Sequence, residues 1–136
     1  RRFPGIDRFL QACVRQATEF GYVATILGRR RAIPEISNQN GNVRGLGERL
    51  AINSVIQGSA ADLIKLAMVN LHRRIVVDRL PMRLLLQIHD ELVLEVPEAD
   101  ADAMAIVVRE EMERAMTLRV PLVADVGIGA NWMAAK

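Results

Sequence analysis

The chain has 136 residues, 51% hydrophobic and 25% charged, a composition typical of one globular domain whose core is aliphatic because only 4% of the residues are aromatic. The single cysteine, Cys13, excludes a disulfide framework, and without a long apolar run or a recognisable signal peptide we expect a cytoplasmic protein. The net charge of +2 is uneven, since residues 1–49 hold nine basic and four acidic residues, and residues 50–136 hold nine basic and twelve acidic ones. This asymmetry suits a polyanion on the first part and metal ions near the second.

The first third of the chain predicts a helix, a short strand and a loop. Pro4 opens a segment with apolar residues at helical spacing, and Gly21 ends it. Residues 22–27 have the composition of a short strand, which Gly28 stops. We expect residues 34–47 to form a mobile loop, because Ser, Asn and Gly crowd its centre.

A long helical segment follows this loop. It is expected to begin near Gly47 or Glu48 and to continue to about Val77. Gly58 interrupts the pattern, so the sequence predicts a bend or two abutting helices there.

The rest of the chain predicts a hairpin, a helix and a further strand. Two apolar runs, residues 83–88 and 92–96, meet at a polar point, which is the pattern of a β-hairpin. Pro97 opens another helix, and residues 122–129 have the composition of a strand. We therefore expect an α+β fold with a small antiparallel sheet of about three strands, open at one edge.

The tip of the expected hairpin carries the most distinctive chemistry in the sequence. His89 stands beside two adjacent carboxylates, Asp90 and Glu91. Rigid oxygen ligands of this kind suit Mg²⁺, which takes one or two carboxylates together with substrate phosphates. The alternative is that both acids are ordinary solvated turn residues, and the hairpin alone does not decide between the two interpretations.

A row of polar residues lies on the long helix. Arg49, Asn53 and Gln57 are spaced by four, so they share one helix face, and all three donate hydrogen bonds. Such a row suits the minor groove of a duplex, where every base pair offers an acceptor. A solvated polar helix face is the alternative.

A compact basic cluster follows Gly28. Arg29, Arg30 and Arg31 can contact phosphates, or they can be the charged residues of an ordinary loop. His89 can likewise donate a hydrogen bond to a nucleic-acid end, or serve as a structural histidine. The sequence has no P-loop and no Cys/His cluster at zinc spacing, which argues against those classes of site.

Two long segments carry a resemblance to a known family. Residues 49–65, which end in Gln-Gly-Ser-Ala-Ala-Asp-Leu-Ile-Lys, and residues 87–95, Gln-Ile-His-Asp-Glu-Leu-Val-Leu-Glu, resemble the C-terminal polymerase region of family A DNA polymerases of the bacterial DNA polymerase I type. Residues 21–31 and 126–132 are similar to that family too. The resemblance covers nearly the whole chain and implies a palm-type sheet whose hairpin is catalytic and packs against helices.

The resemblance implies a reaction and its participants. In the family, a primer 3′ hydroxyl attacks the α-phosphate of an incoming deoxynucleoside triphosphate on template DNA, and two Mg²⁺ ions clamp the attacking and leaving oxygens. Asp90 matches a catalytic, metal-binding aspartate, Glu91 its supporting acidic neighbour, and His89 a residue at the primer terminus. The residues that match the minor-groove and template–primer contacts are Arg49, Asn53 and Gln57.

The chain also departs from the family pattern. The upstream Asp-Tyr-Ser-x-x-Glu motif, which holds the other catalytic aspartate, has no counterpart here, and the nucleotide-gripping fingers helix is absent. Because the chain starts with Arg, we expect a fragment of a longer polymerase, incomplete when isolated and inactive alone. Residues 1–48 then form a fingers-to-palm segment and residues 49–136 a palm segment.

Two other functions stay open from the sequence. A non-enzymatic module that binds duplex nucleic acid would use the basic first part, and its binding would weaken with salt but survive Asp90→Ala. A metal-dependent nuclease would need a second carboxylate cluster near the hairpin tip, and the sequence has no obvious one.

Overall fold

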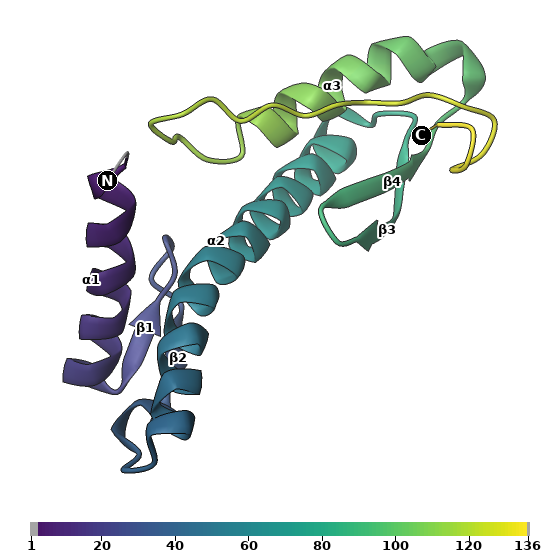
Figure 1. Ribbon diagram of the computed structural model, residues 1–136. Helices are drawn as coiled ribbons and strands as arrows, with labels where there is room; N and C mark the ends of the chain where they lie inside the picture. Colours follow the sequence, from purple (N-terminus) through teal and green to yellow (C-terminus); the bar gives the residue numbers. More distant parts are fainter. Residues whose placement is uncertain (1–2, 136) are drawn as a thin grey trace. The chain divides into compact units, whose positions relative to one another are not determined.

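The computed structural model describes residues 3–135, and the chain divides into two compact units, Arg1–Asp62 and Leu63–Lys136. Helices and short antiparallel hairpins make up both units, so the predicted α+β class is confirmed (Figure 1). Among the described residues the strands form two separate two-stranded sheets, and the expectation of one sheet of about three strands is wrong.

The first unit begins with helix α1 (Pro4–Phe20), whose ends follow the sequence signals. Proline occupies the first turn, and Gly21 ends the helix at a left-handed φ of 73°, donating its N–H to the carbonyl oxygen of Ala17. Strands β1 (Tyr22–Ala24) and β2 (Arg30–Ala32) then pair antiparallel. Side chains from this hairpin, the helices and the following turn form the core of the unit: Ala17, Val23, Ile33, Ile36 and Ala51.

The first strand is shorter than the sequence predicts. Residues 22–27 were expected to be extended, but β1 ends at Ala24 and a tight turn follows. The N–H of Gly28 closes this turn by donating to the carbonyl oxygen of Thr25, and Gly28 has a left-handed φ of 79°. The glycine that was expected to stop a strand is therefore part of the turn itself.

The predicted loop over residues 34–47 is wrong. This stretch contains a short 3₁₀ helix, η1 (Pro34–Ser37), and the first turns of helix α2 (Gly41–Asp78). The side-chain oxygen of Asn40 accepts a hydrogen bond from the backbone N–H of Asn42 at 2.9 Å, as a capping residue does at a helix N-terminus. The asparagines that suggested a loop therefore begin the helix.

Helix α2 is continuous across Gly58, so the expectation of two abutting helices is wrong. Two glycines of this helix lie where another segment packs closely against it. A Cβ added to Gly58 would lie 2.7 Å from Cγ2 of Thr25, and one added to Gly47 would lie 2.7 Å from the backbone nitrogen of Ile36. Both positions need glycine because another segment approaches the helix too closely for a side chain.

The second unit contains the remainder of α2 and the predicted hairpin. Strands β3 (Arg83–Ile88) and β4 (Glu91–Glu95) pair antiparallel, and a 3₁₀ turn, η2 (Glu98–Asp100), leads into α3 (Ala101–Glu113). Apolar residues of the helices, the hairpin and its connections pack around three buried side chains: Leu71, Met82 and Val108.

The strand predicted over residues 122–129 is wrong, because this segment pairs with no strand. It runs along α3 in Figure 1 as an extended chain, and the N–H of Ala124 donates to the Glu113 carboxylate at 3.1 Å. A strand exists only where a partner completes its ladder of hydrogen bonds, and composition alone does not supply that partner.

Two further observations concern the helices. Cys13 is buried on α1, and burial raises the pKa of its thiol, so it packs as a protonated apolar side chain at neutral pH.

Within residues 3–135, no helix combines the length and apolar character needed to cross a membrane.

Candidate functional site

The β3–β4 hairpin ends in a two-residue turn. The ladder pairs Ile88 with Glu91, which leaves only His89 and Asp90 between the strands. The side chains of His89, Asp90 and Glu91 are all exposed. The strand register therefore places His89, Asp90 and Glu91 together, exposed, at one end of the sheet.

The backbone of this turn is strained. His89 has a φ of 53°, in the left-handed region that a non-glycine residue occupies at a cost of about 1–2 kcal/mol. The Gln87 side-chain amide donates to the carbonyl oxygen of His89 at 2.6 Å, which helps to hold the conformation. Strain of this kind is concentrated at functional sites, where a fixed side-chain direction matters more than local stability.

The two carboxylates of the turn are suitable donors for a hard divalent cation. Adjacent aspartate and glutamate oxygens fit Mg²⁺, which keeps waters and shares its shell with phosphates. Within residues 3–135, however, no group of three or more His, Cys, Asp or Glu side chains could hold a metal ion. Asp90 and Glu91 therefore fit part of a magnesium site, which substrate phosphates or ligands from another segment would have to complete.

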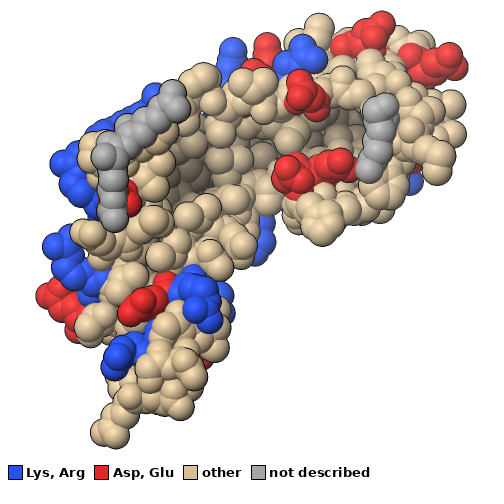
Figure 2. All heavy atoms as spheres, viewed as in Figure 1, with Lys and Arg blue, Asp and Glu red and all other residues tan. Residues whose placement is uncertain are grey.

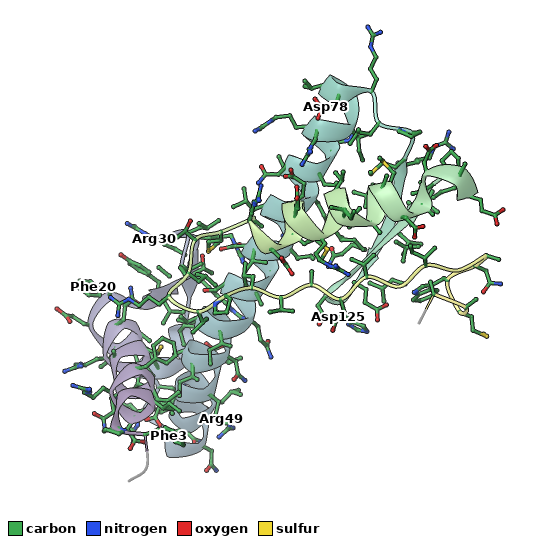
Figure 3. All side chains as sticks on the ribbon, turned by 90° about the horizontal axis from the view of Figure 1, so that it is seen from above. Phe3, Phe20, Arg30, Arg49, Asp78 and Asp125 are labelled. Carbon is green, nitrogen blue, oxygen red and sulfur yellow. The ribbon has the colours of Figure 1, made fainter. Side chains whose placement is uncertain are left out.

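The polar row on α2 lies on an exposed face of the first unit. Arg49, Asn53 and Gln57 are all exposed, and Arg49 projects from the α2 ribbon in Figure 3. Ala51 and Ser54, on the other face of the same turns, are buried. The spacing of four thus places the three donors side by side, as the sequence predicts, with the core behind them.

The three arginines of the basic cluster have different surroundings. Arg29 donates through Nε to the carboxylate of Asp62 at 2.8 Å and through Nη2 to the carbonyl oxygen of Gly58 at 3.0 Å. The guanidinium of Arg30 lies over the ring of Tyr22, 4.6 Å from its centroid. Arg31 is exposed and makes neither contact, so the three arginines do not form one uniform basic patch.

A small pocket connects the basic cluster with the polar row. Its lining includes Arg31 from β2 and Gln57, Gly58 and Ser54 from α2. The hydroxyl of Ser54 is buried and has no hydrogen-bond partner among the described residues. Arg29 lines the same pocket, so the structure brings three of the candidate contact residues to one place: Arg29, Arg31 and Gln57.

Sequence reasoning missed the side chains that hold this arrangement together. Asp62 is only 7% exposed and accepts from both Arg29 and Thr25, and Ser59 accepts from the backbone of Ile26 at 2.9 Å. One signal was available. Asp62 is an isolated carboxylate among the apolar and small residues of α2, and a carboxylate in such a position needs a cationic partner.

Charge is distributed unevenly over the surface. On the face shown in Figure 2, basic side chains predominate on the unit that contains α1, and acidic side chains are grouped over the unit that contains α3. This agrees with the excess of arginine in residues 1–49.

Three comparisons with known proteins agree with one another. The sequence profile of DNA polymerase family A matches residues 1–134. DNA polymerase I of Bacillus caldotenax is 50% identical over 134 residues, covering 98% of this chain and 15% of that protein. DNA polymerase I of Streptococcus pneumoniae serotype 4 is 49% identical over 135 residues, covering 99% of this chain and 15% of that protein.

A solved structure is similar in fold as well. The POL domain of Pol1 from M. smegmatis, in complex with DNA primer-template and dNTP, has a TM-score of 0.93 and 48% identity. The match covers 98% of this chain and 24% of that one. This chain thus spans about 15% of the length of these two curated relatives.

Proposed function

We propose that this chain, which belongs to DNA polymerase family A, supplies part of the active site of a longer DNA polymerase, called the parent polymerase below. The parent would extend a primer on template DNA with deoxynucleoside triphosphates, in bacterial DNA replication and repair in the cytoplasm. The observation that carries the proposal is the strained turn that presents Asp90 and Glu91 at the end of a β-hairpin. The similar M. smegmatis domain, described with primer-template and dNTP, supports these partners.

The turn would act as one half of a metal-binding site. Asp90 would be the ligand of the catalytic Mg²⁺ ions and Glu91 the supporting acid, and another carboxylate would come from a segment outside residues 1–136. Two bound Mg²⁺ ions would supply charge stabilisation of the attacking and leaving oxygens. His89 would donate a hydrogen bond at the primer terminus, and the fixed backbone of the turn would keep all three side chains pointing toward the reacting end.

The polar row and the arginines would bind the duplex. Arg49, Asn53 and Gln57 would donate to minor-groove acceptors, which differ little between base pairs, so that the contacts depend on duplex shape and not on sequence. The basic cluster, Arg29, Arg30 and Arg31, was expected to contact phosphates, and this role is kept here for Arg30 and Arg31.

We assign residues 1–48 to a fingers-to-palm segment and residues 49–136 to the palm. Because a two-metal site held by a single aspartate motif is incomplete, the isolated chain would not polymerise. A duplex-binding module without catalysis is the second candidate. The exposed donor row on α2 favours it, since duplex binding by these residues requires no metal.

The test is primer extension by the parent polymerase with Asp90→Asn. We expect kcat to fall by about 10³-fold, several kcal/mol of transition-state stabilisation, with unchanged folding. Asp125→Asn is the matched control, since Asp125 is an exposed carboxylate of the same unit and belongs to neither strand nor turn of the hairpin. Equal activity of both variants and the unsubstituted enzyme would rule out a catalytic Asp90 and leave the binding module as the better interpretation.

A further inference from the structure

We infer that Arg29 and Asp62 are positioning residues, which hold the β1–β2 turn on α2 and thereby fix Arg31 beside Gln57. The inference rests on the proposed function, because it assigns Arg31 and Gln57 to the duplex. It differs from the expectation that Arg29 itself contacts phosphate.

The contact centres on the buried carboxylate of Asp62, both of whose oxygens accept a hydrogen bond. One oxygen of Asp62 accepts from Nε of Arg29 at 2.8 Å, and the other accepts from the hydroxyl of Thr25. Asp62 is 7% exposed, whereas Arg29 is 53% exposed. A carboxylate this deeply buried is stabilised by its cation and its hydrogen-bond donors. If the turn left the helix, the Asp62 carboxylate would lose both Arg29 and Thr25, so undocking the turn is costly.

Further hydrogen bonds join the same turn to the same stretch of helix. Nη2 of Arg29 donates to the carbonyl oxygen of Gly58 at 3.0 Å, and the backbone N–H of Ile26 donates to the hydroxyl of Ser59 at 2.9 Å. That hydroxyl in turn donates to the carbonyl oxygen of Val55 at 2.6 Å. The absence of a side chain at Gly58 makes room for the close approach of Thr25. The turn is therefore docked by side chains, backbone and shape together.

The short ladder transmits this docking to Arg31. The backbone N–H of Thr25 donates to the carbonyl oxygen of Arg29 at 2.9 Å, and β1 pairs with β2 so that Val23 stands opposite Arg31. Val23 is 1% exposed in the core. With both ends of the hairpin fixed, Arg31 is held at the pocket that it shares with Gln57.

A charge-changing substitution separates positioning from direct phosphate contact. If Arg29 were a phosphate ligand partly neutralised by Asp62, Asp62→Asn would free its charge and tighten DNA binding. If the pair positions Arg31, the same substitution weakens binding although the protein becomes more positive. We expect the Kd of the parent polymerase for a primer–template duplex to rise about 2- to 30-fold, the range of coupling through packed networks.

Arg29→Lys is the second variant, and it keeps the charge. A lysine cannot reproduce the two-pronged contact to Asp62 and Gly58, but it serves as well as arginine for a point contact with phosphate. We expect Arg29→Lys to weaken binding about as much as Asp62→Asn. Glu19→Gln is the control for charge, since Glu19 is an exposed carboxylate on α1, and we expect it to leave the Kd unchanged or slightly lower.

The energetic coupling to Arg31 in DNA binding separates a positioning role from a general structural role. In an Arg31→Ala background, Asp62→Asn should add less than a twofold further loss, measured below the unfolding transition of every variant. Tighter or unchanged binding in Asp62→Asn, full binding in Arg29→Lys, or additive losses with Arg31→Ala would overturn the inference. Failure of the unsubstituted parent polymerase to extend a primer would instead count against the proposed function, so the two failures are distinguishable.

Discussion

Two hairpins of similar size are fixed in opposite ways. The β1–β2 turn in the first unit is held by long-range contacts to α2, which join residues about thirty positions apart in the chain, such as Arg29 and Asp62. The β3–β4 turn in the second unit is fixed locally, by its strand register and by the bond from Gln87 to the backbone of His89. A turn fixed by local rules can place catalytic side chains at an exposed tip. A turn docked on a helix can set the spacing between binding residues on two elements.

The largest effect on stability should come from removing the cation of the docked turn. Arg29→Met removes the cation beside the buried Asp62 carboxylate, while Thr25 still donates to it, and we expect the free energy of unfolding to fall by about 2–3 kcal/mol. Arg29→Met combined with Asp62→Leu should recover most of this loss, because no charge then remains buried. Urea denaturation with both variants measures the difference. A double variant that is less stable than the single one would show that the pair itself, and not the unpaired charge, governs stability.

A smaller effect should follow from filling the space at Gly58. In a helix, Gly→Ala normally stabilises by about 0.5–1 kcal/mol, but at Gly58 the new Cβ meets Thr25, and we expect a net loss of about 1–2 kcal/mol. Gly45 is the matched control on the same helix, since its nearest neighbour would be the flexible end of Arg49 at 3.9 Å. Gly45→Ala should stabilise the protein. A gain of stability at both positions, by thermal or chemical denaturation, would mean that the turn does not press on α2.

The smallest effect should come from relaxing the exposed turn. His89→Gly removes the cost of a left-handed φ, so we expect the free energy of unfolding to rise by roughly 1 kcal/mol or less. The same substitution removes the proposed primer-terminus donor, so primer extension by the parent polymerase should slow. The two hairpins differ as proposed if His89→Gly raises stability but lowers activity, whereas Arg29→Met lowers both. A loss of stability in His89→Gly would show that the relief of the left-handed φ is smaller than the extra conformational entropy that glycine gives the unfolded chain.

The contrast between the hairpins also explains what the sequence could predict. The end of α1 at Gly21 and the tip at His89 and Asp90 follow from residue spacing within a few positions, and both lie where the sequence predicts. The family resemblance is confirmed by the match over residues 1–134.

Two of the failures concern partners that are distant in the chain or absent from the described residues. Among residues 3–135, the segment 122–129 pairs with no strand. The partner of Arg29 lies more than thirty residues away, on a helix where it is one acid among apolar side chains. Residues 34–47 failed for a local reason, because Asn40 is equally at home in a loop and at a helix cap. No periodicity in the sequence distinguishes these alternatives.

The central claim is that residues 1–136 hold one part of a divided active site. Mg²⁺-dependent primer extension tests it most directly, with residues 1–136 alone and with the parent polymerase, which would add the upstream aspartate motif and the nucleotide-gripping fingers helix. We predict extension by the parent polymerase only, and its loss on Asp90→Asn. Extension by residues 1–136 alone, abolished by Asp90→Asn, would contradict the account, because the chain would then hold a complete catalytic site.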